Sequence, residues 1–541
     1  MIFASDLTWI ILLPVLGSVA VIAAPRSIAR WLALGFSAAT FVLSLVILFN
    51  IATNGHPQPF GNLNNLPDSI HTSWIDIKAG AVDIKIDYFL GVDGLSLPMV
   101  ILNALLTMLA VIGGWEKVRV KEYMALLLVL EAGVMGVFMA LDLLLFFLFW
   151  EVELAPMFLL IGIWGSEVIK HGMPGRVYSA WKFLLYTFFG SVFMLAGILL
   201  LYFTNVNNHG TATASMQYFA THYFNGTINV FGITMGLQLL TFLLIFLAFA
   251  VKIPMFPFHT WLPDAHTDAP TEVSVILAGI LLKMGAYGLI RICFTLFPFG
   301  VNAFAPVLAV LAIINIIYGA GICLVQTDMK KLIAYSSVSH MGIILLGVAA
   351  AATSIDLTHG TLNAFGMAAL TGATIQMFSH GIITGLLFFC VGVIYDHAHT
   401  REIAVFGGVA KRMPMLATLF TFAGLASLGL PGLAGFVAEY MAFTGSYQSL
   451  PVVTTICVFT MILTASYLLW MLKRVFYGPF NTRWNWLPDA NLRECIPLFA
   501  LAAVIVFVGI YPTPLVNVIT PSLNHILTHI SHVVGVAGAG R

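Results

Sequence analysis

Two stretches of sequence decide how this chain folds: LLTFLLIFLAFAVKIPMFPF (residues 239–258) and GILLKMGAYGLIR (residues 279–291). Both belong to apolar segments whose length suits a membrane-spanning helix. Each carries a lysine, Lys252 in the first stretch and Lys283 in the second. A charge at bilayer depth costs about 3 kcal/mol on insertion scales, and such residues usually mark a path for ions or protons. Both lysines are therefore candidate functional residues.

Composition sets the class of protein. The chain has 541 residues, of which 60% are hydrophobic and 9% are charged, and its mean hydropathy is +0.99. Soluble domains carry about 25% charged residues, so we predict an all-α integral membrane protein whose surface contacts the lipid bilayer. The net charge of zero offers no basis for a nucleic-acid partner. The five cysteines have no metal-binding spacing and no nucleotide motif occurs, so we expect neither a metal nor a cofactor in this chain.

Apolar segments predict fourteen transmembrane helices in a single integral membrane domain over residues 1–541. The predicted ranges are 7–24, 29–51, 88–113, 122–140, 142–165, 178–203, 233–260, 272–295, 302–325, 332–352, 362–395, 414–445, 452–472 and 496–519. If the chain starts outside, most of the 23 Lys and Arg fall in loops on one side. By the positive-inside rule that side is cytoplasmic, and both termini lie outside. Before the third helix, the alternation in SWIDIKAGAVDIKIDY (residues 73–88) predicts a short hairpin.

The seventh and twelfth predicted helices are interrupted. Pro254 and Pro257 follow Lys252, and Pro431 precedes Glu439 in a glycine-rich stretch. Irregular backbone at membrane depth is tolerated only where it is buried in protein or lines a water-filled cavity. Paired interruptions in corresponding halves of a chain are typical of inverted-repeat transporters with a site at the midplane. Each interrupted helix also carries one deep charge.

Three carboxylates lie in apolar segments of the first half. Glu151 lies in LFFLFWEVELAPMF (residues 145–158), too deep to reach either surface, and it is either functional or a protonated structural group. Glu153 is two residues further on, about 200° round a regular helix, so we expect it to face elsewhere. Glu131 is a lone carboxylate in LLVLEAGVMG.

Two histidines lie in apolar helices between the lysines and Glu439. His340 (SSVSHMG) and His380 (MFSHGIITG) could shuttle protons, because histidine titrates near neutrality, or each could be a satisfied core group. Another four polar side chains could suggest a metal site, but their turn is proline-rich and predicted to be cytoplasmic, so we expect no metal there. These four are His259, Asp264, His266 and Asp268.

The motifs resemble a known family. FAVKIPMFPFHTWLPDAHTDAPTEVSVILAGILLKMGAYGLIR (residues 249–291) and QTDMKKLIAYSSVSHMG (residues 326–342) are similar to the antiporter-like membrane subunits of respiratory complex I, NADH:quinone oxidoreductase. Within that family, the subunit M type is favoured by three further stretches. They are GVDGLSLPMV (residues 91–100), LFFLFWEVELAPMFLLIGIWG (residues 145–165) and GLPGLAGFVAEYM (residues 429–441).

The resemblance implies a fold and a set of proton-transfer residues. It implies fourteen helices, with helices 4–8 (residues 120–300) and 9–13 (residues 301–475) as inverted repeats and with helices 7 and 12 broken. By motif, the proton-transfer residues are Glu151, Lys252, Lys283, His340, His380 and Glu439. It further implies that Glu151 stabilises the protonated Lys252. Glu131 and Glu153 receive no role from the resemblance.

The resemblance also implies partners and a location. NADH, FMN, iron–sulfur clusters and quinone are expected in partner subunits, and the neighbouring chains are expected to be the L- and N-type antiporter-like subunits. The expected location is the bacterial inner membrane, with both termini on the periplasmic side. Three alternatives stay open: a subunit of an Mrp-type sodium/proton antiporter, the membrane subunit of a proton-pumping hydrogenase, and a structural scaffold. The cost of the deep charges argues against a scaffold.

Overall fold

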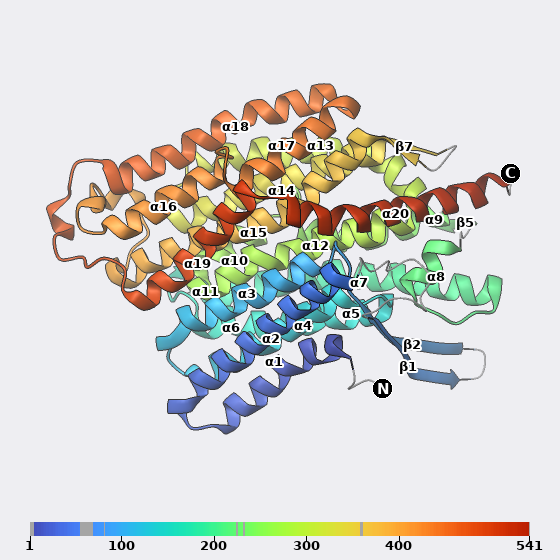
Figure 1. Cartoon of the computed structure of the whole chain (residues 1–541), viewed down its shortest axis with the longest axis horizontal. Coiled ribbons are helices and arrows are strands. Elements are labelled where there is room, and N and C mark those ends of the chain that lie inside the picture. Colours follow the sequence, from blue (N-terminus) through green and yellow to red (C-terminus); the bar gives the residue numbers. More distant parts are fainter. Residues whose placement is uncertain are drawn as a thin grey trace.

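The computed structural model describes residues 5–54, 69–79, 82–222, 226–230, 233–357 and 361–539. It is a bundle of long helices that lie roughly side by side, with short hairpins at one end (Figure 1). Among the described residues, 12 helical segments are long and apolar enough to cross a membrane, and Leu237–Lys252 and Pro414–Ser427 are shorter apolar helices. A mostly helical multi-pass membrane protein is thereby confirmed, while the count of fourteen spans stays a prediction.

The first half of the chain forms twelve α-helices. They are α1 (Asp6–Ala23), α2 (Arg26–Asn54), α3 (Leu97–Gly113), α4 (Val120–Met139), α5 (Leu143–Val152), α6 (Leu154–Trp164), α7 (Gly175–His209), α8 (Met216–Thr221), α9 (Leu237–Lys252), α10 (Trp261–Asp268), α11 (Thr271–Ile276) and α12 (Leu282–Gly288). Two π-helical turns, Leu277–Leu281 and Leu289–Phe294, flank α12.

The second half forms eight more helices. They are α13 (Pro298–Cys323), α14 (Met329–Thr353), α15 (Ala364–Ala398), α16 (Pro414–Ser427), α17 (Ala434–Ser449), α18 (Pro451–Leu472), α19 (Leu492–Ile510) and α20 (Thr513–Ala539). The strands form four antiparallel hairpins. They are β1 (Ser69–Ala79) with β2 (Val82–Gly91), β3 (Ile169–Lys170) with β4 (Met173–Pro174), β5 (Thr227–Val230) with β6 (Ile233–Gly236), and β7 (Ile355–Asp356) with β8 (Thr361–Leu362).

The predicted hairpin before the third helix is confirmed. Strand β1 pairs with β2 from Ser69 opposite Gly91 to Ala79 opposite Val82. This pairing also corrects the start of the next helix, because the segment predicted to be helical from residue 88 is still in β2. Helix α3 begins only at Leu97.

The last predicted helix, 496–519, was wrong in its extent. The structure places α19 and α20 there, and they are separated at Tyr511 and Pro512. Tyr511 has a non-helical backbone (φ −129°, ψ 72°), and the residue before a proline is disfavoured in the helical region. Helix α20 then continues to Ala539, twenty residues beyond the predicted end.

The most deeply buried of the described spans are those that carry Lys283, His340 and His380. Within the spans Thr271–Phe294 and Ala364–Ala398 the most apolar window is 100% buried, and in Met329–Thr353 it is 94% buried. By contrast, only 33% of the corresponding window in Pro451–Tyr477 is buried. Helices α14 and α15 pack against each other, and α17 packs against both. The candidate site therefore lies in the interior of the protein and not on the face that lipid covers.

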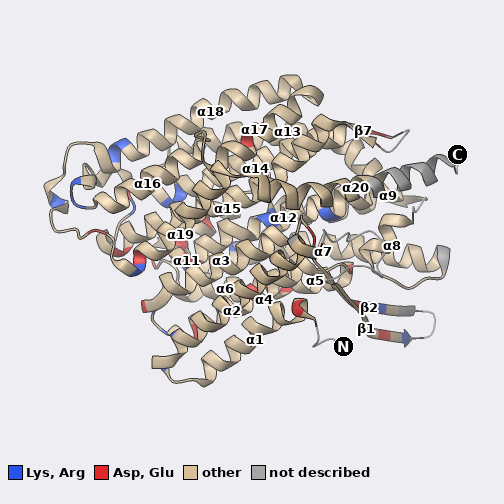
Figure 2. Ribbon diagram, in the orientation of Figure 1, with Lys and Arg blue, Asp and Glu red and all other residues tan. Residues whose placement is uncertain are grey.

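Charges are sparse along the helices and gather near their ends. Figure 2 shows Lys and Arg residues in the loops beside α16, at the end of the bundle opposite the hairpins β1–β2 and β7–β8. Loops that the sequence places on one side also meet in space. The backbones of Asp328 and Glu402 form an isolated antiparallel β-bridge on one side. Those of Asp142 and Ser215 form another on the opposite side.

Candidate functional site

Lys252 is the last residue of α9, and its side chain is buried. The helix ends here because Pro254 has no amide hydrogen and disrupts the helical hydrogen-bond ladder. The ammonium group forms an ion pair with the buried carboxylate of Glu153. The rings of Trp150 and Phe183 lie 5.4 and 5.6 Å from Nζ, within the range of cation–π attraction. The charge of Lys252 is thus compensated by protein groups.

The residue expected to pair with Lys252 was Glu151, but the ion pair in the structure is with Glu153. Glu151 is half-buried on α5. The reason is a break that the sequence analysis did not include. Pro156 cannot donate a hydrogen bond to the carbonyl of Val152, so α5 ends at Val152 and Glu153 lies in the turn before α6. Glu153 was expected to face elsewhere than Glu151, and the side chain that it contacts is Lys252.

Lys283 lies in α12, and it is completely buried. Its Nζ donates a hydrogen bond to the carbonyl of Ala278, within the π-helical turn Leu277–Leu281. Single π-helical turns are frequent at functional sites. On the other side, Nζ lies 2.7 Å from Nδ1 of His380 on α15. The lysine therefore contacts one backbone carbonyl and one titratable ring.

The two predicted histidines and Glu439 complete a row of titratable groups. The ring centroids of His380 and His340 are 5.6 Å apart. Nδ1 of His340 lies 3.4 Å from Oε1 of Glu439, and its Nε2 lies 3.2 Å from Oγ of Ser427. Since Lys283 contacts His380, four predicted site residues form one continuous row across α12, α15, α14 and α17.

The break between α16 and α17 shapes the Glu439 end of this row. Gly429 and Gly432 have φ values of 75° and 90°, which favour glycine. A Cβ on Gly429 would lie 2.4 Å from Oε2 of Glu439, whereas a Cβ on Gly432 would meet no atom within 4 Å. Gly429 is thus required both for the turn and for the close approach of the carboxylate.

Two small cavities border the row, and each touches both His340 and Glu439. Their polar lining includes Ser339, Ser427 and Gln376. Each has about 10 Å³ of space for water centres, which is room for about one water molecule. The row therefore has places where water could bridge the histidines and the glutamate.

The row does not extend directly to Lys252. Among the described residues, no hydrogen bond or ion pair joins Lys252 to Lys283. The two helices nevertheless pack closely, because a Cβ on Gly285 of α12 would lie 3.0 Å from Cβ of Lys252. The structure thus separates a Lys252–Glu153 pair from the row that begins at Lys283.

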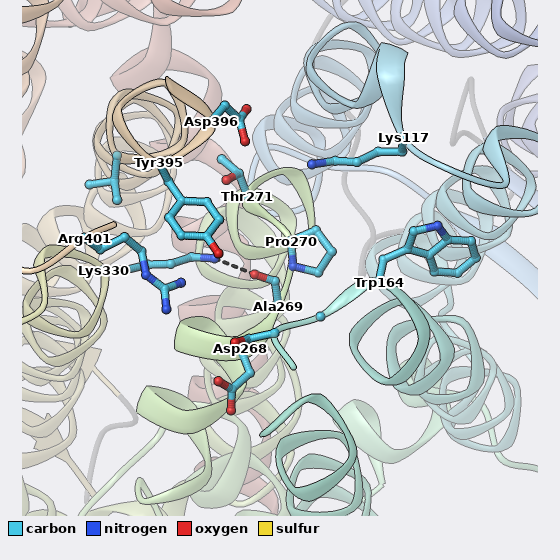
Figure 3. Close-up of a pocket in the computed structure, with 13 residues that line it drawn as sticks. Lys117, Trp164, Asp268, Ala269, Pro270, Thr271, Lys330, Tyr395, Asp396 and Arg401 are labelled. Atoms are coloured by element: carbon cyan, nitrogen blue, oxygen red, sulfur yellow. Dashed lines mark hydrogen bonds between the residues drawn. The ribbon is translucent and has the colours of Figure 1, made fainter. Parts of the chain in front are cut away.

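A larger polar cavity of about 110 Å³ opens near the ends of several helices (Figure 3). Its lining comes from loops that the sequence places on the cytoplasmic side. The polar lining residues are Lys117, Ser166, Asp268, Thr271, Lys330, Tyr395, Asp396 and Arg401. The Nζ of Lys330 donates to the carbonyl of Ala269 at 2.5 Å. The cavity can hold several water molecules.

Charged groups connect this cavity to the protein interior. The Nζ of Lys117 lies 3.2 Å from Oε1 of Glu272, whose other oxygen accepts a hydrogen bond from Tyr123 at 2.9 Å. Burial acts to lower the pKa of Lys117, but the neighbouring Glu272 and Asp396 carboxylates offset this and raise the pKa above its ordinary value. Lys117 is therefore held as a cation beside the cavity.

Three buried polar groups were missed or misplaced in the sequence analysis. Glu153 was assigned no role. His266 is completely buried and stacks on Phe388 with ring centroids 4.8 Å apart. Arg291 was given no role, but it is 1% exposed and its Nη2 lies 2.5 Å from Oδ1 of Asp93. A signal for Arg291 was present, because it lies inside an apolar run.

The proline-rich turn with four possible metal ligands is held by other contacts. Lys182 binds Asp264 at 2.7 Å, and Lys170 binds Asp268 at 2.7 Å. His259 lies 3.2 Å from the hydroxyl of Tyr318. Over the part of the chain that the structure describes, no group of three or more His, Cys, Asp or Glu could hold a metal ion.

Comparison with known proteins identifies the family. The family described as NADH:quinone oxidoreductase/Mrp antiporter, TM matches residues 140–464, a range that includes all six predicted proton-transfer residues. Over 503 residues the chain is 41% identical to NADH-quinone oxidoreductase subunit M of Rhodobacter capsulatus, covering 92% of this chain and 90% of that protein. It is 38% identical to NAD(P)H-quinone oxidoreductase chain 4 of Gloeobacter violaceus, covering 96% and 92%.

Solved structures agree. A chain of respiratory complex I from Thermus thermophilus with bound NADH aligns with a TM-score of 0.78 and 26% identity, covering 96% of this chain and 99% of that chain. An archaeal membrane-bound sulfane sulfur reductase shows the same fold at a TM-score of 0.78 and 21% identity, covering 97% and 99%. The chain belongs to the NADH:quinone oxidoreductase/Mrp antiporter transmembrane family. Within it, the prediction of a subunit M type membrane subunit is confirmed.

Proposed function

We propose that this chain moves protons across the membrane as a subunit of NADH-quinone oxidoreductase, driven by electron transfer in other subunits. The observation that carries the proposal is the row Lys283, His380, His340 and Glu439, in which each group lies next to the following one. All four side chains are buried, and every one of them can bind or release a proton.

The row supports transfer from the protein interior toward Glu439. A proton leaving the Lys283 ammonium has His380 as its first acceptor, at 2.7 Å. The ring centroids of the two histidines are 5.6 Å apart, no hydrogen bond joins the two rings among the described residues, and the cavity that touches both has room for about one water. His340 then contacts Glu439. In this proposal Glu439 passes the proton to the outer side.

The cavity near Lys117 and Lys330 is the proposed place of proton uptake. Supporting this, its lining comes from loops that the positive-inside rule assigns to the cytoplasm. The end of α10, at Asp268, and the start of α11, at Thr271, both line this cavity. With this orientation, both termini lie on the periplasmic side of the bacterial inner membrane.

The finer architecture is also part of the proposal. The shorter helices α9 and α16, each followed by an irregular break, are counted as parts of spans seven and twelve, which gives fourteen spans. Residues 120–300 and 301–475 are then the two inverted repeats. In support, one break carries Lys252 and the other lies before Glu439. The L- and N-type chains are the proposed neighbours, and NADH, FMN, iron–sulfur clusters and quinone belong to other subunits.

The test uses the assembled enzyme with the substitution Lys252→Ala or Glu151→Ala. We expect fewer protons moved per electron in proteoliposomes, with the electron-transfer cofactors intact. An unchanged number of protons per electron in both variants would contradict the proposed function. Co-purification with NADH-oxidising subunits separates this function from that of an Mrp-type antiporter.

A further inference from the structure

We propose that Glu153 is a second proton-carrying partner of Lys252, so that this lysine alternates between two carboxylates, Glu153 and Glu151. The inference rests on the proposed function and deepens it. It adds a residue to which the family resemblance gives no role, and it explains why two carboxylates lie two positions apart in one buried region.

The backbone first makes the arrangement possible. In an unbroken helix, residues 151 and 153 would project about 200° apart, and one lysine could not serve both. Here α5 ends at Val152, and Glu153 lies in the turn that Pro156 produces. Lys252 is likewise at the end of a helix broken by proline. Both partners of the ion pair therefore lie at helix ends, where small backbone adjustments are less costly than inside a helix.

The electrostatics link all three groups. Lys252 interacts electrostatically with both Glu151 and Glu153. The charge of Glu151 in turn interacts with that of Glu153. Oε2 of Glu153 and Oε1 of Glu151 are buried, and neither has a hydrogen-bond partner among the described residues. Each carboxyl group thus keeps one oxygen available for a proton or a water molecule.

The two carboxylates differ in their surroundings. Glu153 is completely buried, whereas Glu151 is half-buried next to an exposed apolar surface that includes Leu148 (37% exposed) and Val152 (44% exposed). An ionised carboxylate beside lipid would be costly. Glu151 is therefore the member of the pair that can respond to a charge outside this chain, and Glu153 is the one that stays with Lys252 at rest.

Charge balance defines the exchange. One ammonium and two carboxylates carry a net charge of −1, which is unfavourable in a buried site, so one carboxyl group holds a proton. At rest, Lys252 pairs with ionised Glu153 and Glu151 is protonated. In the exchange, the O–H bond of Glu151 breaks and an O–H bond forms on Glu153, while the ammonium moves to ionised Glu151. The site remains neutral in both states, and no other reactant is needed.

The decisive experiment compares Glu153→Gln with Glu151→Gln in the assembled enzyme. The glutamine cannot ionise, so either variant leaves Lys252 with one partner and stops the exchange. We expect coupled NADH:quinone activity to fall about tenfold or more in each, because positioned acid–base groups typically contribute about 10²-fold or more. Infrared difference spectra during turnover should show two carboxylic-acid C=O bands of opposite sign in the native enzyme, and each variant should lose both, because the remaining carboxylate stays ionised beside the Lys252 ammonium.

Glu131→Gln is the matched control. Glu131 is also a buried glutamate, and it lies in the neighbouring helix α4. Among the described residues, no charged group interacts electrostatically with its carboxyl group. We expect this variant to keep its coupled activity and both infrared bands. Native activity and both bands in assembled Glu153→Gln enzyme would overturn the inference. If Lys252→Ala also kept its protons per electron, the proposed function itself would be contradicted, so the two failures are distinguishable.

Assembly is measured separately, on native gels. If Glu153→Gln does not assemble, Glu153→Asp is used, since it keeps the ionisable group and shortens the side chain by one methylene. We expect this variant to retain part of the coupled activity and to shift the C=O band assigned to residue 153. An unshifted pair of bands in that variant would also overturn the inference.

Discussion

The Nζ of Lys283 lies 2.7 Å from Nδ1 of His380, although 97 positions separate the two residues along the chain. The lysine comes from α12 and the histidine from α15, and both side chains are buried. This contact joins the two halves of the protein at the place where the proposed proton path crosses between them.

The His380 ring is expected to carry protons and not only to accept a hydrogen bond. Asn in its place can still accept from the Lys283 ammonium but cannot titrate, so His380→Asn should assemble and lose coupled activity by about tenfold or more. Proton movement and NADH:quinone activity in proteoliposomes check this. His397→Asn is the control, because His397 lies on the same helix and contacts only a peripheral carboxylate, Glu494, at 3.3 Å. Native activity in His380→Asn would contradict the path.

Gly429 is expected to be more sensitive to substitution than Gly432. Both have positive φ values, so Ala at either position costs about 1 kcal/mol in backbone strain. Only at position 429 would the new Cβ also meet Glu439, at 2.4 Å. Gly429→Ala should therefore lower coupled activity as well as thermal stability, whereas Gly432→Ala should lower stability alone. Equal activity in the two variants would show that the close approach to Glu439 has no functional role.

The buried pair of Asp93 and Arg291 is expected to be structural. Removing one partner leaves an uncompensated buried charge, so Arg291→Ala should destabilise the protein by about 3–5 kcal/mol. The more exposed pair of Arg493 and Glu116 serves as the comparison, and Arg493→Ala should cost about 1 kcal/mol or less. Thermal denaturation of the purified enzyme measures both. Similar shifts for the two variants would be inconsistent with this reading of Arg291.

Asp142 should make stability depend on pH. Burial raises the pKa of its carboxyl from 3.8 to about 7. The folded state therefore binds more protons than the unfolded state, and the stabilising contribution is complete below about pH 4 and is lost as pH rises through about 7. The loss is of the order of a few kcal/mol. Asp142 caps α5 by accepting from the amides of Leu144 and Leu145, which Asn can also do.

The check is the denaturation midpoint of the native enzyme and of Asp142→Asn at about pH 4 and about pH 8. We expect similar midpoints at the lower pH and a higher midpoint for Asp142→Asn at the higher pH. A variant that is equally destabilised at both pH values would instead indicate that the cap itself is lost.

Much of the fold could be predicted from apolar length and from proline. Long apolar runs have one stable form in a membrane, because helices satisfy every backbone hydrogen bond internally. For this reason the predicted helix ranges near α1, α2, α13 and α14 agree with the structure to within a few residues at each end. The extent of α19 and α20 was missed because polar residues after Pro512 give no apolar signal.

The candidate residues were also visible in the sequence, because a charge in an apolar run is costly and therefore rare. Their partners were not. Helical periodicity predicted that Glu153 faces elsewhere than Glu151 but could not show that it contacts Lys252, which is 99 positions away. Arg291 lies in the apolar stretch GILLKMGAYGLIR, but its partner Asp93 is 198 positions away along the chain, so the sequence could not show this pair.

The sequence by itself determined the class of protein, the membrane helices, the two proline breaks and the set of buried titratable residues. These depend on local composition and on the cost of placing a charge in lipid. Only the tertiary structure decided which carboxylate pairs with Lys252, that Lys283 meets His380, and that His340 meets Glu439. Such contacts depend on how distant helices pack, and Pro156 disrupts the helix so that α5 ends at Val152 and Glu153 lies in the turn before α6.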